Sequence, residues 1–72
     1  MNIIQKGEKT MRLTAKDMIK QKLLDAQENV RDFQEYSGKI EDKEVEETFK
    51  RFAEDSGFQA RKLQELLDKY EK

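Results

Sequence analysis

Residues 37–42 read SGKIED, and this short segment decides the fold. Gly38 is expected to end one helix in the left-handed conformation that glycine adopts readily. Asp42 is expected to cap the next helix, whose first turn is rich in glutamate. Because the link between the two helices is so short, the second must fold back antiparallel to the first. The segment therefore predicts a helical hairpin.

Before this link, apolar residues recur at spacings of three and four, which marks one face of a helix. Thr14 and Asp17 form a capping-box pattern at its start, so the first helix is expected over residues 15–37. Residues 1–13 have no clear period and are expected to form a flexible N-terminal tail, with Met11 as an alternative start. The apolar stripe consists of Ala15, Ile19, Leu23, Ala26, Val30 and Phe33.

The second helix is expected over residues 43–70, which places the whole hairpin within residues 14–72. Two polar residues, Ser56 and Gln59, fall at the centre of its apolar stripe. A buried polar group without a partner costs about 1–3 kcal/mol, so both need hydrogen bonds, for example to their own copies in a symmetric dimer. The favoured interpretation is a polar pair in a loosely packed seam. The stripe is Val45, Phe49, Phe52, Ser56, Gln59, Leu63, Leu67 and Tyr70.

The composition limits the chemistry of this chain. Its 72 residues make one domain at most, and it has neither cysteine nor histidine, which removes disulfides, thiolate metal sites and the usual acid–base group. We therefore expect a protein that is not an enzyme and has no cofactor. No stretch approaches the roughly 20 apolar residues of a membrane span, so a cytoplasmic protein with no membrane partner is expected.

A two-helix hairpin cannot enclose its apolar face, whereas two hairpins pairing as a four-helix bundle can. The predicted fold class is therefore all-α: an antiparallel two-helix hairpin that forms a homodimer. Residues 35–47 carry six acidic against two basic groups, while the first helix starts with lysines, so the hairpins are expected to dock antiparallel. Candidate contacts with the second copy, or with an unidentified protein partner, are Met18, Leu24, Tyr36 and Phe58.

Residues 36–67, YSGKIEDKEVEETFKRFAEDSGFQARKLQELL, resemble the second half of a rubrerythrin-type, ferritin-like helix pair. In that family an acidic turn precedes a V-x-x-x-F/L pattern and then F/L-A-E-x-E-x-x-H-A, whose Glu-x-x-His unit binds iron. The similarity extends over residues 23–67 and implies a ferritin-like hairpin.

The resemblance also locates the family's iron ligands, all of which are substituted here. The Glu-x-x-His positions fall on Ser56 and Gln59, and the first-helix glutamate falls on Ala26 when counted from Phe33. These are degenerate ligand positions, and no metal is expected at them. The resemblance therefore implies a self-associating structural or adaptor module rather than an iron enzyme.

Three other functions are open to this sequence. A divergent, rubrerythrin-like protein would bind metal through carboxylates at a dimer seam. A small regulator would dock its basic tail on an acidic partner. Nucleic-acid binding is not favoured: the first 24 residues carry six basic against two acidic groups but lack interleaved aromatic residues.

Overall fold

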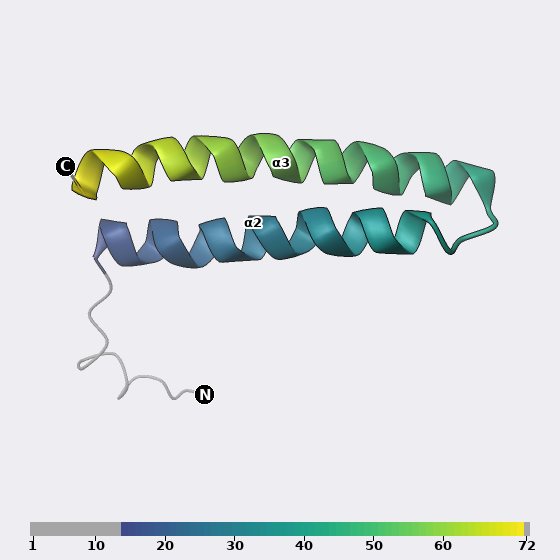
Figure 1. The fold of residues 1–72 in the computed structure, drawn as a ribbon, viewed down its shortest axis with the longest axis horizontal. Helices are drawn as coiled ribbons and strands as arrows, with labels where there is room; N and C mark the ends of the chain where they lie inside the picture. The colour runs from purple at the N-terminus through teal and green to yellow at the C-terminus, as the bar shows by residue number, and fades with distance from the viewer. Residues whose placement is uncertain (1–13, 72) are drawn as a thin grey trace, which may run out of the picture.

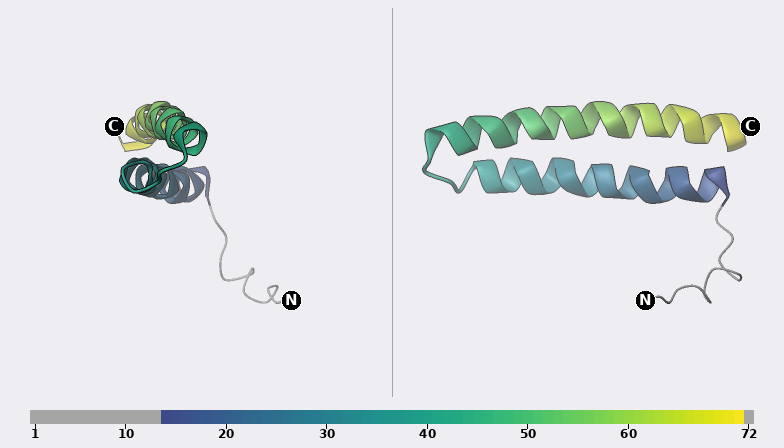
Figure 2. Two further views of the ribbon diagram at one scale, coloured as in Figure 1. Left: turned by 90° about the vertical axis from the view of Figure 1, so that its right-hand side faces the viewer. Right: turned by 180° about the vertical axis from the view of Figure 1, so that it is seen from behind.

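The computed structural model describes residues 14–71, which form two long helices joined by a tight turn (Figure 1). Helix α2 spans Ala15–Ser37 and helix α3 spans Lys43–Glu71. The helices run antiparallel and lie side by side along their length (Figures 1 and 2). Within residues 14–71 there is no strand, so the all-helical hairpin is confirmed. The expected tail over residues 1–13 lies outside the described residues.

The predicted capping box starts α2. The Asp17 amide donates to Thr14 Oγ1 at 3.1 Å, and the Thr14 amide donates to Asp17 Oδ2 at 3.3 Å. These bonds satisfy two amides that the helix itself leaves unpaired. The backbone N–H of Thr14, followed by its hydroxyl, holds the pKa of Asp17 below its ordinary value.

Removing this cap is expected to shorten the helix. Thr14→Ala should lower the unfolding free energy by about 1 kcal/mol. The depressed pKa of Asp17 means that its contribution is present above the unfolded-state pKa and is lost as the pH falls through the folded-state pKa. The variant keeps the backbone N–H of residue 14 and loses only the hydroxyl, so the difference between wild type and variant should shrink modestly in acid, as measured by urea unfolding at neutral pH and near pH 2.

Thr48→Ala is the matched control for this experiment. The Thr48 hydroxyl donates to the Glu44 carbonyl of its own helix at 2.8 Å and caps no helix end, and alanine is the better helix former. Equal losses in the two variants would contradict a capping role for Thr14.

The turn differs from the expectation at Gly38 but not at Asp42. Asp42 Oδ1 accepts from the amides of Glu44 and Val45 at 3.0 and 3.2 Å, as an N-cap does. Gly38 is right-handed, with φ −78° and ψ −10°, so the predicted left-handed conformation is wrong. The N–H groups of Lys39 and Ile40 both donate to the Tyr36 carbonyl, and the N–H of Gly38 donates to the Glu35 carbonyl, so these carbonyls are paired without a left-handed residue.

The seam between the helices repeats at spacings of three and four on both helices, as in a coiled coil. Its centre is built from small side chains: Ala26 is 3% exposed, and Ala53 and Ser56 are each 6% exposed. The seam residues are Ile19, Leu23, Ala26, Val30, Phe33 and Ser37 on α2, and Phe49, Ala53, Ser56, Ala60, Leu63 and Leu67 on α3.

Larger side chains close the seam toward its two ends. Near the turn, Phe33 packs edge-on against Phe49 and Phe52, with ring centroids 5.2 and 5.5 Å apart. Toward the open end, Leu23 and Leu67 are each 7% exposed. Each aromatic pair contributes about 0.5–1.5 kcal/mol beyond its buried area, so Phe33 is an important contact of the hairpin.

The observed seam corrects part of the two predicted stripes. Gln59 was expected in the buried stripe and is exposed, as are Phe52, Tyr70 and Ala15. The reason is the repeat: a seam shared by two helices follows 3.5 residues per turn, so it passes through Ala53 and Ala60 rather than through their neighbours Phe52 and Gln59.

Candidate interaction surfaces

The three degenerate ligand positions do not come together as one site. Ala26 and Ser56 lie in the seam, whereas Gln59 is exposed outside it. No buried side-chain nitrogen or oxygen of residues 14–71 lacks a hydrogen-bond partner. The same stretch of chain contains no group of three or more carboxylates positioned to hold a metal ion. Ser56 is therefore a small seam residue, and within one hairpin it does not form the predicted buried pair with Gln59, which is exposed there.

The hairpin has two broad sides, and a residue is assigned to one or the other by whether it follows or precedes a seam residue in the sequence. Gln34, which follows seam residue Phe33, lines the same hollow as Gly57, which follows seam residue Ser56. Residues that follow these seam positions therefore face one side of the hairpin. Residues that precede seam positions face the opposite side: Tyr36 before Ser37, Phe52 before Ala53, Gln59 before Ala60 and Leu66 before Leu67.

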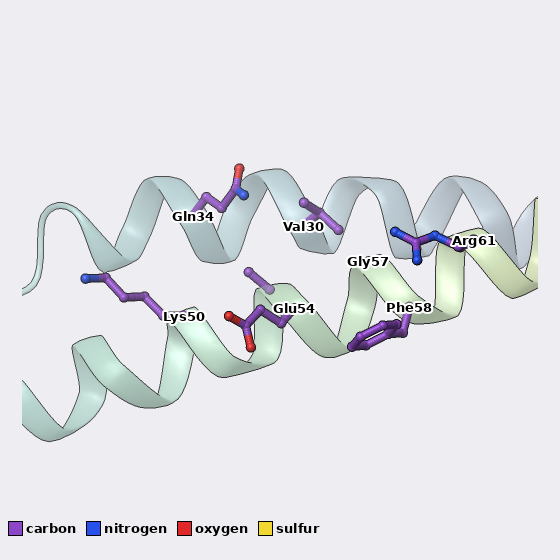
Figure 3. A pocket seen from close by; sticks show the side chains of 8 residues that line it. Val30, Gln34, Lys50, Glu54, Gly57, Phe58 and Arg61 are labelled. Atoms are coloured by element: carbon purple, nitrogen blue, oxygen red, sulfur yellow. The ribbon is translucent and has the colours of Figure 1, made fainter.

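The first side carries an open groove of about 540 Å³ between α2 and α3, which we call the Gly57 groove (Figure 3). Charged side chains from α3 line it, and the Arg61 guanidinium lies 5.8 Å from the centre of the Phe58 ring. A Cβ added at Gly57 would meet nothing within 4 Å, so no contact inside the hairpin requires glycine there. The lining residues are Val30, Gln34, Lys50, Ala53, Glu54, Gly57, Phe58 and Arg61.

The opposite side carries four of the six large hydrophobic side chains that are exposed among residues 14–71, and we call it the Tyr36 face. Met18 lies eighteen residues before Tyr36, which is five helical turns, so the two side chains align on α2. On α3, Leu66 and Tyr70 line a hollow of about 350 Å³ together with Ile19. Four large side chains of this face are 42–55% exposed: Met18, Tyr36, Phe52 and Tyr70.

The four predicted contact residues are all exposed, but they divide between the two sides. Met18 and Tyr36 belong to the Tyr36 face. Phe58 lines the Gly57 groove, and Leu24, which follows seam residue Leu23, lies on that side. Phe52, Leu66 and Tyr70 were not singled out as surface residues. Reading α3 with a repeat of 3.5 instead of 3.6 residues would have placed Phe52 and Leu66 beside the seam.

Neither α2 nor α3 is apolar enough over a sufficient length to cross a membrane. Comparisons of this chain with protein-family models, with curated proteins and with solved structures give no match. The resemblance to ferritin-like proteins therefore stays a prediction, and function must be argued from the surfaces themselves.

Proposed function

We propose that this chain is a non-enzymatic, self-associating helical-hairpin protein of the cytoplasm, which serves as a structural or adaptor module. Two hairpins would pair as a four-helix bundle of ferritin-like type, without the iron ligands. Each copy would supply two of the four helices, and the apolar surface left over by one hairpin would be covered by the other.

The observation that carries this proposal is the Tyr36 face. Its exposed apolar side chains form two groups, Tyr36 with Phe52 near the turn and Met18 with Tyr70 toward the open end. Exposed apolar side chains gathered on one side of a small protein are typical of a site of protein association. Only four hydrophobic residues of the described chain are buried, two of them alanines, so little apolar surface is covered within one hairpin. Pairing would add the burial that a chain of this size lacks.

The side chains at the former ligand positions support a role without metal chemistry. Alanine offers no ligand, the serine hydroxyl and glutamine amide are weak ligands for iron, and histidine and cysteine are absent from the sequence. The metal-binding alternative would need carboxylates contributed by both copies at their shared seam.

The first experiment is light scattering after size exclusion at tens of micromolar protein. We expect about twice the chain mass of 8.6 kDa, because the apolar surface of one copy is buried by the next. A compact, stable monomer under these conditions would overturn the proposal. Elemental analysis of the same untagged preparation tests the alternative: about one metal ion per chain, retained through dialysis, would favour the metal-binding function instead.

A further inference from the structure

The neighbours shared by α2 and α3 show which residues of the two helices lie at the same height along the long axis of the hairpin, which we call their level. Phe33 packs against both Phe49 and Phe52, and Ile19 lines one hollow with Leu66 and Tyr70. Ala26 lies seven residues from both Phe33 and Ile19, and Gln59 lies seven residues from both Phe52 and Leu66. Because Phe33 lies between Phe49 and Phe52, and Ile19 between Leu66 and Tyr70, Ala26 and Gln59 lie at about the same height along the hairpin.

Two apolar side chains of the α3 part of the Tyr36 face, Phe52 and Leu66, are placed symmetrically about Gln59, whereas Tyr70 would lie opposite the partner's Thr48. Phe52 and Leu66 lie seven residues on either side of Gln59, about 10 Å away at 1.5 Å per residue. If a second α3 packs antiparallel across a two-fold axis at Gln59, Phe52 meets the partner's Leu66. Asp55 lies four residues before Gln59 and Lys62 lies three residues after it. Asp55 of one copy is then next to Lys62 of the other copy, and the two side chains have opposite charges.

The α2 part of the same face is symmetric about nearly the same level. Met18 and Tyr36 lie nine residues on either side of Gln27, and Lys22 and Asp32 lie five residues on either side. Gln27 follows Ala26, so the two centres differ by about one residue, or 1.5 Å. One axis thus pairs Met18 with the partner's Tyr36 and Lys22 with the partner's Asp32. A single two-fold axis requires the centre of the residue pairs on α2 and the centre of those on α3 to lie at the same level, and the two centres agree to within about one residue.

We propose, on the basis of the self-association proposed above, that a second copy of the chain docks antiparallel on the Tyr36 face about a two-fold axis that crosses α3 at Gln59. The Gln59 amides of the two copies meet at the axis, where each can donate to the other and thereby fix the register. The apolar pairs supply affinity, and the two charge pairs select the antiparallel orientation. A parallel arrangement would instead bring two acidic turns together.

The Gly57 groove is the weaker candidate for the same contact. Its walls carry Lys50, Glu54 and Arg61, and its side of the hairpin exposes two large apolar side chains, Leu24 and Phe58. The Tyr36 face has four such side chains. Burial of apolar area dominates association, so the second copy favours the Tyr36 face.

Single cysteines test the axis directly, because the natural chain contains none. Gln59→Cys places the two thiols at the proposed axis, and mild oxidation or a short thiol cross-linker should give a covalent dimer in high yield. Phe58→Cys is the matched control: it is the adjacent residue, it faces the groove side, and it should remain largely uncross-linked. Cross-linking through Phe58→Cys but not Gln59→Cys would overturn the assignment of the face.

A charge substitution supplies a second readout that does not depend on thiol geometry. Gln59→Glu brings two like charges together at the axis and should raise the dimer dissociation constant about 10-fold or more. Gln27→Glu makes the same chemical change on the groove side of α2 and should change it less than about 3-fold. Sedimentation equilibrium measures both constants. A wild-type chain that is monomeric throughout would refute self-association itself, whereas a dimer insensitive to Gln59→Glu would refute only this face.

Discussion

Phe33→Ala is expected to remove much of the stability of the hairpin. Phe33 is the side chain through which α2 contacts both Phe49 and Phe52 near the turn. Because Phe33 is only half-buried, we expect the unfolding free energy to fall by about 2–3 kcal/mol, less than the roughly 3–5 kcal/mol of a fully buried phenylalanine. A small domain has only a few kcal/mol in total, so a large share of the molecules should unfold. Urea unfolding followed by circular dichroism at one protein concentration measures the change.

Phe58→Ala is the control that separates packing from residue type. Phe58 is 66% exposed, and its only aromatic or cation contact among residues 14–71 is with Arg61 of the same helix. Its removal should alter the unfolding free energy by no more than about 0.5 kcal/mol. If the two variants lost equal stability, the Phe33 cluster would not be the packing centre of the hairpin.

Ala26→Glu is expected to disrupt the hairpin to a similar or greater degree. Ala26 is 3% exposed, and the side chains opposite it in the seam are small. A glutamate there must either push the helices apart or leave its carboxylate without water, at a cost of about 3 kcal/mol or more. The ferritin-like resemblance places the glutamate ligand of the first helix at this position, so the variant tests whether the seam has room for a carboxylate side chain.

The pH dependence of this variant follows from linkage. Burial would raise the pKa of the introduced carboxyl above its unfolded value, so the folded state would bind more protons and stability would fall as the pH rises. The loss should therefore be smaller at pH 4 than at pH 7. Gln27→Glu, the exposed neighbour, should show neither the large loss nor this pH trend. Ala26→Glu behaving like Gln27→Glu would mean that the seam is open enough for a ligand.

The first and last residues of the helices could be predicted from the sequence alone because capping is a local interaction. Thr14 with Asp17, and Asp42 with the two amides that follow it, act within three residues of one another, so no distant part of the chain decides the outcome. Both helices begin at the expected residue, and α3 ends one residue later than expected. The short link likewise permitted only an antiparallel return.

The conformation of Gly38 and the position of Gln59 could not be predicted from local interactions in the sequence. Gly38 remains right-handed because the carbonyl of Tyr36 finds its donors in the two residues beyond the glycine, a choice that depends on how the turn closes. Gln59 lies outside the seam because the partner helix selects which part of a broad apolar stripe it covers. Several side chains of α3 can face inward by helical spacing alone, and packing against α2 favours the line through Ala53, Ser56 and Ala60.

Spacing along one helix thus limits the possible contact faces, but only the close packing of two helices decides between them. A side chain buries apolar area only where a neighbouring surface fits against it, and that fit is a property of both helices together. The same selection leaves Phe52 and Tyr70 exposed, and it creates the Tyr36 face on which the proposed dimer depends.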